Sequence, residues 1–373
     1  MGARARRGAA GGGTALKARR ALIGWYRANR RDLPWRRTRD PWAVWVSEAM
    51  LQQTRALTVI PYYERFLRRF PDPASLARAD LDDVLGLWAG LGYYSRARNL
   101  RAAAAQVVEC FGGSVPDTVE QLQTLPGVGR YTAGAVASIA FDRPAPVVDG
   151  NVARVLSRLR GIREAVDGAA GRARLWTEAE ALASGPAPGD LNQALMELGA
   201  RVCLPRAPRC PICPVARHCA ARAAGDAESL PRRAPRRKPR AVHAVAALVL
   251  RRGRALAVRR PPRGLFGGLW QLPGAEVASA RTADAVTLAR VVRERTGLEI
   301  GAVEPAGRLE HGLTHRTLRL RVFRCEAKPG RVRLSGWDRH RWVTPQAFAG
   351  FPLGALDRRA LTLASGLEQE DRS

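Results

Sequence analysis

The chain has 373 residues, of which 46% are hydrophobic and 25% charged, a composition typical of a globular protein with two or three domains. Lys and Arg number 62 against 33 Asp and Glu, a net charge of +29 that predicts a polyanionic partner, nucleic acid before anionic membrane. No apolar segment of the sequence approaches the length of a membrane span, which excludes an integral membrane protein.

Residues 1–13 are rich in Arg, Ala and Gly and lack the apolar core of a secretory signal. They predict a disordered basic arm on a cytoplasmic, nucleoid-associated protein, with an Arg-rich organelle-targeting segment as the alternative. Between residues 14 and 224 apolar residues recur at helical spacing, interrupted by short loops containing Pro and Gly. This region is therefore expected to be entirely α-helical.

Glu48 lies in a strongly apolar helical segment of the stretch Arg31–Thr54. An exposed helical Glu is the simplest interpretation, but the neighbouring Trp42, Trp45 and Met50 disfavour a solvated position. An apolar pocket would raise the pKa of Glu48 and keep it protonated near neutral pH. A carboxyl group in that state can act as a general acid.

Two glycines, Gly127 and Gly129, flank Val128 in a turn between two helical segments. Glycine lets the backbone approach a ligand closely, and the following helix offers its unpaired N-terminal amides. The turn therefore predicts a site for an anion such as a DNA phosphate. A tight helix-turn-helix that needs glycine only for packing is the alternative.

Asp149 stands at a loop-to-helix junction after this turn, ahead of a helix with an apolar face that includes Val152 and Leu159. A capping Asp is the simpler interpretation. The helix N-terminus would also hold the carboxylate ionised. In the helix near residues 190–202, Gln193 and Glu197 share a face distinct from the apolar one.

Four of the six cysteines, Cys203, Cys210, Cys213 and Cys219, lie close together in the sequence. Disulfide frameworks are typical of short secreted chains, so metal ligation fits this arrangement better. The alternatives are a zinc ion and a four-iron four-sulfur cluster. Structural zinc sites usually contain two close Cys pairs, and only one is present here.

A change of pattern follows the helical region. Residues 225–241 are basic and rich in Pro, which predicts an extended linker. Beyond it, strands are expected at 245–250, 255–258 and 317–322, and a helix is expected at 282–295. Residues 242–365 therefore predict a smaller α+β domain, and 366–373 a tail.

These motifs resemble the adenine DNA glycosylases of the helix-hairpin-helix (endonuclease III) superfamily. The resemblance extends from about residue 16 to 365 and includes Gly264–Gly274, which is similar to a segment of their C-terminal Nudix-like domain. It implies a six-helix hairpin domain at about 32–141, a cluster domain formed by about 14–31 and 142–224, and a Nudix-like domain at 242–365. It also favours one four-iron four-sulfur cluster over zinc.

The resemblance implies excision of adenine mispaired with 8-oxoguanine or guanine in double-stranded DNA, after the base has flipped out of the helix. Glu48 would protonate adenine at N7, because adenine is a poor leaving group as an anion. Asp149 would stabilise the sugar cation or act as a transient nucleophile. Tyr131 and Asn151 complete the expected catalytic set.

Strand-cleaving relatives carry a Lys in the second helix of the hairpin, where this chain has Tyr131. The sequence contains no Lys between Lys17 and Lys238. A Schiff-base nucleophile is therefore not expected, and the resemblance implies a monofunctional glycosylase.

The remaining expected contacts also follow from the resemblance. Arg31, Trp35, Arg36 and Gln193 would form the adenine pocket, and a Gln suits the N6 donor and N7 acceptor of adenine. DNA contacts are expected from Gln53, Thr54, Leu91, Gly92, Tyr93, Gly127, Val128 and Gly129. For Tyr93 and Tyr94 a place in the hydrophobic core is the alternative.

8-Oxoguanine would be read by Leu313, Thr314 and His315, where the family usually has Phe-Ser-His. The Thr hydroxyl can replace that of Ser, whereas Leu lacks the aromatic ring. A surface His ahead of a strand is the alternative for His315.

True Nudix hydrolases bind Mg²⁺ with the carboxylates of a box motif. Anchored on Gly297, this chain keeps Glu294 but has Val291 and Arg295 where acids are needed. Pyrophosphate cleavage and a Mg²⁺ requirement are therefore not expected.

Two rival functions are an endonuclease III-type glycosylase and lyase acting on oxidised pyrimidines, and a non-catalytic iron–sulfur DNA-binding protein. Tyr131 and the C-terminal domain disfavour the first, and Glu48 with Asp149 disfavours the second. The protein is expected to act as a monomer away from membranes.

Overall fold

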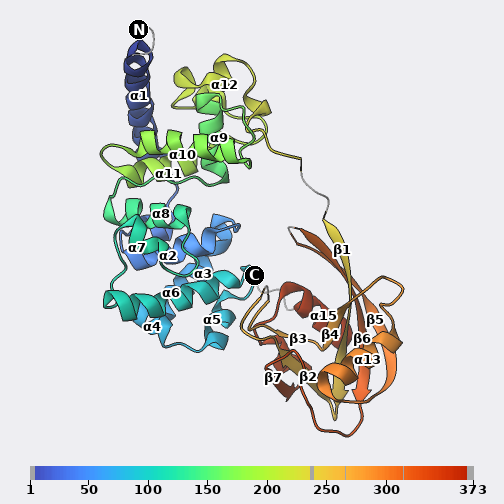
Figure 1. Cartoon of the computed structure of the whole chain (residues 1–373). Helices are drawn as coiled ribbons and strands as arrows, with labels where there is room; N and C mark the ends of the chain where they lie inside the picture. The colour runs from blue at the N-terminus through green and yellow to red at the C-terminus, as the bar shows by residue number, and fades with distance from the viewer. Residues whose placement is uncertain (1–4, 236–238, 265, 314, 368–373) are drawn as a thin grey trace. The chain divides into compact units, whose positions relative to one another are not determined.

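The computed structural model describes residues 5–235, 239–264, 266–313 and 315–367. The chain divides into two compact units: Met1–Arg78 with Asn99–Pro235, and Ala79–Arg98 with Arg236–Ser373. Figure 1 labels their helices and strands. None of the helices in the described ranges is both long and apolar enough to cross a membrane.

The described residues of the first unit form helices joined by loops, and none of them forms a strand. Its α-helices are α1 (Ala5–Asn29), α2 (Pro41–Leu51), α3 (Ala56–Arg69), α4 (Pro73–Ala77), α6 (Ser95–Phe111, with its first turn in the second unit), α7 (Val119–Gln123), α8 (Arg130–Phe141), α9 (Gly150–Arg160), α10 (Ala169–Ala183), α11 (Pro188–Arg201) and α12 (Ala220–Ala223). Short 3-10 helices are η1 (Pro34–Arg36), η2 (Cys210–Ile212), η3 (Ala216–His218) and η4 (Ala227–Ser229). The predicted all-α region is confirmed.

Helix α1 begins inside the segment for which a disordered arm was expected. It starts at Ala5 and is continuous to Asn29. The Ala and Arg residues of this segment have high helix propensity, but its four glycines, Gly8 and Gly11 to Gly13, have low propensity, so local propensity does not account for the difference.

Helix α11 lies at the centre of the core of the first unit. Its residues Leu191, Leu195 and Leu198 are almost fully buried and belong to a cluster shared with α1, α8 and α9. Packing this apolar face fixes the rotation of the helix. Gln193 and Glu197 are thereby held on a different face, as the helical spacing predicts.

The second unit contains a seven-stranded mixed sheet with helices, which confirms the predicted α+β class. Its strands are β1 (Arg240–Arg251), β2 (Arg254–Arg259), β3 (Trp270–Gln271), β4 (Gly274–Val277), β5 (Ile300–Gly312), β6 (Arg316–Ala327) and β7 (Arg339–Val343). Its helices are α5 (Leu81–Trp88), α13 (Ala285–Thr296), α14 (Pro345–Ala349) and α15 (Ala355–Ser365).

The strand order is β3-β2-β1-β6-β5, with β4 paired to β1 and β7 to β2 (Figure 1). Strand β1 is parallel to β6 and antiparallel to β2 and β4. Leu248 and Leu250 of β1 pack in the cluster that contains α15, whereas Val245 and Val249 pack in the cluster that contains α13. The two faces of the sheet are therefore covered by different helices.

The boundary between the units at Pro235 and Arg236 falls inside the expected linker, of which residues 236–238 lie outside the described ranges. Residues 79–98 were expected in the hairpin domain but pack with the second unit. There the hydroxyl of Tyr94 donates to the Leu353 carbonyl at 2.9 Å. Such a long-range pairing leaves no signature in local sequence.

Candidate active site

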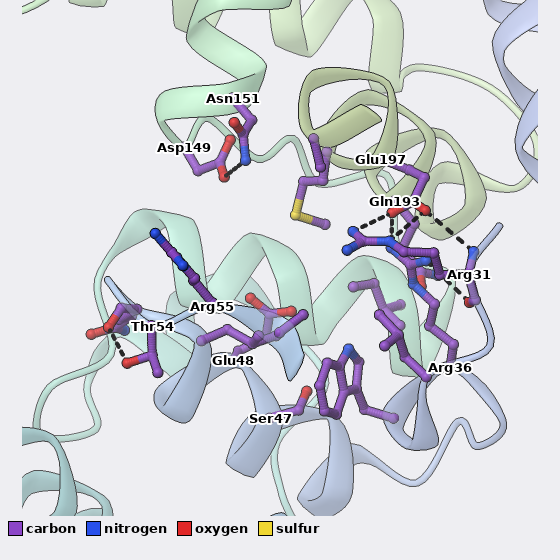
Figure 2. Close-up of a pocket in the computed structure, with 18 of the residues that line it drawn as sticks. Arg31, Arg36, Ser47, Glu48, Thr54, Arg55, Asp149, Asn151, Gln193 and Glu197 are labelled. Atoms are coloured by element: carbon purple, nitrogen blue, oxygen red, sulfur yellow. Dashed lines mark hydrogen bonds and ion pairs between the residues drawn. The ribbon is translucent and has the colours of Figure 1, made fainter. Parts of the chain in front are cut away.

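A cavity of about 760 Å³ opens in the first unit, with walls from the segment around η1 and from α2, α8, α9 and α11 (Figure 2). It gathers residues that are distant in the sequence. Of the residues singled out from the sequence, those that line it are Arg31, Trp35, Arg36, Glu48, Gln53, Thr54, Tyr131, Asp149, Asn151 and Gln193.

Glu48 projects into this cavity from the middle of a buried helix. Helix α2 begins at Pro41, where the Asp40 carboxylate accepts hydrogen bonds from the amides of Trp42 and Ala43. Every residue from Trp42 to Met50 is buried, and Glu48 itself is 5% exposed. The burial expected from the flanking apolar residues is thus present.

The Glu48 carboxyl group has a strongly shifted pKa. Burial raises the pKa of Glu48 to about 7, and the negative charge of Asp149 adds to this effect. The Tyr131 hydroxyl, which donates to Glu48 Oε2 at 2.8 Å, and the charge of Arg36 act in the opposite direction. The direction is the one expected from an apolar pocket, and it leaves about half of the Glu48 side chains protonated at neutral pH.

Asp149 lies on the facing wall, at the N-cap of α9 (Figure 2). Its Oδ1 accepts from the Val152 amide at 2.7 Å, and Asn151 Nδ2 lies 3.5 Å from Oδ2. Burial raises the pKa of Asp149 above its ordinary value, and the amides of Val152 and Asn151 only partly oppose this. The helix N-terminus alone predicted the opposite direction, because the sequence did not show how deeply the carboxylate is buried.

Arg154 links the region of Asp149 to the cysteine loop. Its Nη2 donates to Asn151 Oδ1 and to the Gly199 carbonyl, both at 2.8 Å. Its Nε donates to the Cys203 carbonyl at 2.8 Å. One mostly buried guanidinium therefore joins α9, α11 and the start of the loop.

Glu197 is a site residue to which the sequence assigned no role. Its side chain is fully buried, and it accepts from Arg31 Nη2 at 2.7 Å and from Arg36 Nη2 at 2.8 Å. Although burial alone acts to raise the pKa of Glu197, the hydrogen bonds and charges of these two arginines lower it to about 2. The signal for Glu197 in the sequence was its helical spacing from Gln193, which places both side chains on the same face of the helix.

Gln193 lies one helical turn before Glu197 and has a fixed orientation. Its Oε1 accepts from the hydroxyl of Tyr26 at 2.8 Å, while Arg36 lies over the Tyr26 ring at 5.5 Å from its centroid. Tyr26 on α1 thus holds the Gln193 amide, and Glu197 on α11 holds Arg31 and Arg36.

Two of the residues expected to contact DNA have a left-handed backbone. Gln53, at the edge of the cavity, has φ 60°, and Tyr93 has φ 49° with 48% of its surface exposed. Non-glycine residues in this region are strained and occur often at functional sites. Leu91, Gly92 and Tyr93 belong to the second unit, whereas the cavity belongs to the first.

The hairpin turn between α7 and α8 requires glycine at one position only. Gly127 has φ 77°, and a Cβ there would lie 2.6 Å from Asn99 Cβ. Gly129 has an extended backbone with open space where a Cβ would stand, and Val128 between them is buried. Packing therefore explains Gly127, and the open space at Gly129 leaves the N-terminus of α8 accessible.

Cys203, Cys210, Cys213 and Cys219 lie in the loop that contains η2 and η3, each partly buried. Arg158, which is buried, places Nη1 3.4 Å from Cys203 Sγ and donates to the Leu204 and Pro205 carbonyls. In the described ranges, no three His, Cys, Asp or Glu side chains are arranged to hold a metal ion. Four thiols on one loop, with a guanidinium group beside one of them, are the type of donor set that iron–sulfur clusters use.

The residues expected to read 8-oxoguanine fall at the turn between β5 and β6 in the second unit. Leu313 is half-buried and its amide donates to the Arg316 carbonyl at 2.7 Å, while His315 is exposed. Thr314 lies outside the described residues. On α13, Val291 is buried and Glu294 pairs with Arg290 at the surface.

Two family models match the chain. One, described as "HhH-GPD superfamily base excision DNA repair protein", matches residues 46–178, and a NUDIX domain model matches residues 244–363. The first match contains Glu48, the hairpin and Asp149.

Curated relatives match over most of the chain. An adenine DNA glycosylase of Rattus norvegicus is 38% identical over 386 residues, covering 88% of this chain and 74% of the relative. The human protein of that name is 37% identical over 385 residues, covering 88% and 70%. A solved thermostable thymine-DNA glycosylase is 29% identical with a TM-score of 0.51, covering 57% of this chain and 97% of its own.

Proposed function

Because the chain belongs to the adenine DNA glycosylases, DNA N-glycosylases of base excision repair, we propose that its cavity excises adenine mispaired with 8-oxoguanine or guanine. One observation carries the proposal. A buried carboxyl group with a pKa of about 7, Glu48, faces a second buried carboxyl group, Asp149, across a cavity large enough for a flipped base. The relatives do not favour an endonuclease III-type activity on oxidised pyrimidines.

The proposed reaction begins with a proton transfer from Glu48 to N7 of the flipped adenine. The bond between the sugar C1′ and N9 then breaks, and its electron pair leaves with adenine. Asp149 stabilises the cation that forms at C1′ or bonds to it transiently, and water completes the hydrolysis. Tyr131 orients Glu48 through its 2.8 Å hydrogen bond, and Asn151 lies beside Asp149.

The pocket residues would select adenine by its edge. Gln193, with its Oε1 engaged by Tyr26, presents an amide, and Arg31, Trp35 and Arg36 complete the walls. Gln53, Thr54, the Leu91–Tyr93 turn and the hairpin would contact the DNA. Leu313–His315 would read the partner base.

We assign a four-iron four-sulfur cluster to Cys203, Cys210, Cys213 and Cys219. Bound there, it would fasten the loop that carries Arg206, Arg209 and Arg217 toward the DNA backbone. No redox chemistry on the substrate is required of it. The protein is proposed to act as a monomer associated with the nucleoid.

The decisive experiment is single-turnover excision on a duplex with one adenine opposite 8-oxoguanine, analysed with and without alkali. Strand breaks only after alkali are expected, because Tyr131 replaces the Lys that a lyase needs. Breaks without alkali would reveal an unassigned amine nucleophile. No product on this duplex together with activity on oxidised pyrimidines would refute the proposal.

The excision rate is expected to fall as pH rises. Glu48 acts in its protonated form, and its folded-state pKa of about 7 means that the active form is lost above that pH. The single-turnover rate should fall about tenfold per pH unit well above the pKa. A rate profile is the measurement, with duplex binding and circular dichroism recorded at each pH to exclude unfolding. A flat profile through this range would contradict the assignment of Glu48.

Replacing Glu197 by Gln is expected to slow excision roughly tenfold, because the variant loses the charge that holds Arg31 and Arg36 at the pocket wall. The melting temperature should also fall, since two guanidinium groups lose a buried partner. Glu178→Gln is the matched control. Glu178 likewise pairs with two arginines, Arg160 and Arg174, away from the cavity. Equal excision rates in the two variants would mean that the charge of Glu197 does not contribute to excision.

A further inference from the structure

Arg96, the second residue of α6, follows directly on the Leu91–Tyr93 turn and belongs to the same unit. An arginine beside a segment that contacts DNA is the kind of residue expected to bind a phosphate group. The Arg96 side chain is buried, however, with only 8% of the residue exposed. Little of its guanidinium group is therefore available to the DNA, and its role has to be sought inside the protein.

The guanidinium group of Arg96 binds the carbonyl groups of the turn. Its Nη2 donates to the Leu91 carbonyl at 3.1 Å and to the Gly92 carbonyl at 2.9 Å. Its Nε donates to the Tyr93 carbonyl at 3.4 Å. Three consecutive carbonyl groups are thus directed at one cation, which fixes the orientation of the peptide planes in the turn.

The backbone that these carbonyl groups belong to has an uncommon conformation. Gly92 and Tyr93 follow one another in the left-handed region, with φ 69° and φ 49°. For a residue with a side chain, such as Tyr93, this conformation costs free energy and persists only when its surroundings enforce it. Although burial lowers the pKa of Arg96 to about 10, the group remains charged at neutral pH and can supply that enforcement.

Arg96 also fixes the ring of Tyr93. Its guanidinium carbon lies 5.7 Å from the centroid of the Tyr93 ring and 5.4 Å from that of the Trp88 ring. Trp88 is fully buried, whereas Tyr93 keeps 48% of its surface exposed. The cation therefore connects an exposed ring to the buried interior of the unit.

We propose that Arg96 is a positioning residue, which holds the Leu91–Tyr93 turn in the conformation that inserts the Tyr93 ring into the DNA beside the mispair. The inference rests on the proposed function, which assigns this turn to DNA contact. A ring that stacks on a base loses less entropy on binding when its turn is already held in place. Arg96 thus raises DNA affinity through Tyr93, without a DNA contact of its own.

The test is a double-mutant cycle of Arg96→Lys and Tyr93→Ala in the full-length protein. Affinity is measured by gel shift with a duplex that carries 8-oxoguanine opposite 2′-fluoro-2′-deoxyadenosine, because fluorine at C2′ disfavours the sugar cation and so prevents excision. Lys keeps the charge but lacks the fork of donors and the flat face of Arg. Arg19→Lys is the matched control, since Arg19 is 5% exposed and donates to the Leu182 and Pro186 carbonyls at the end of α10.

Arg96→Lys and Tyr93→Ala are each expected to weaken binding about tenfold, and the double variant should bind no more weakly than Tyr93→Ala alone. Arg19→Lys should bind as the wild type does, although its melting temperature falls as well. An equal loss from Arg96→Lys with and without Tyr93 would overturn the proposal, because Arg96 would then not act through that ring. An unchanged affinity of either single variant, or an equal loss in Arg19→Lys, would overturn it too.

Gly92→Ala strains the same turn without altering Arg96. A Cβ at Gly92 meets no atom within 4 Å, so only the left-handed backbone opposes the substitution. Weaker binding is expected, whereas Gly112→Ala, which makes the same change in open space after α6, should bind as the wild type does. Wild-type affinity in Gly92→Ala would overturn the proposal even if Arg96→Lys did not fold. Adenine excision is recorded separately, and a bound but uncleaved natural mispair would refute the proposed function alone.

Discussion

Replacing Glu48 by Gln is expected to lower the single-turnover rate of adenine excision by about 10³-fold, while the mispaired duplex is still bound. The amide keeps the size of the side chain and its hydrogen bond from Tyr131, but it has no acidic proton that could be transferred to N7. Adenine would then have to leave as an anion. The measurement pairs single-turnover excision with a gel-shift titration of the same duplex.

Glu64→Gln provides the matched control, because Glu64 is an exposed residue of α3 outside the cavity. It should excise at the wild-type rate. If Glu48→Gln excised as fast as this control, another acid would have to protonate adenine. If it failed to bind the duplex, a folding defect would have to be separated from the chemistry by the melting temperature of the variant.

The position of Glu48 in a buried helix could be predicted because the signals are local. Asp40 and Pro41 fix the start of α2, and the apolar residues around Glu48 lie within two turns of it. Local pattern therefore predicted burial, and burial dominates the pKa of Glu48. The same reasoning predicted the apolar face of α11 and the turn that contains Gly127 and Gly129.

Other features depend on contacts between segments that are far apart in the sequence. Glu197 meets Arg31 and Arg36 across more than 150 positions, and Arg154 meets Cys203 across 49. The packing of residues 79–98 with the second unit is of the same kind. Helical spacing showed which face Glu197 occupies but not which partners approach that face, so the ion pairs were not predicted.

The two carboxyl groups of the cavity differ in a way that follows from their surroundings. Both are buried, but only Asp149 receives hydrogen bonds from the amides of a helix N-terminus. These amides favour the charged form of Asp149 and partly offset the burial that raises its pKa, which supports the proposed roles of Asp149 as carboxylate and Glu48 as acid. This division matches the needs of a reaction in which one group gives a proton while the other faces a cation.

Asp149→Asn is expected to slow excision by about 10²- to 10³-fold, because the cation at C1′ loses the negative charge that faces it. The substitution should leave α9 intact. Asn caps helices as well as Asp does, and its side-chain oxygen can accept from the Val152 amide. Asp284→Asn makes the same change at the N-cap of α13, where Asp284 accepts from the Thr287 amide at 2.8 Å.

The two variants therefore lose the same charge at the same kind of helix terminus, and only Asp149 lies in the cavity. Because burial raises the pKa of Asp149, Asp149→Asn should leave the melting temperature unchanged or raise it. Hydrogen bonds from Thr287 lower the pKa of Asp284, so Asp284→Asn should lower the melting temperature slightly. Only Asp149→Asn should slow excision. Equal excision rates would mean that Asp149 is a structural cap. The cation would then be stabilised from elsewhere, and the two-carboxylate mechanism would have to be abandoned.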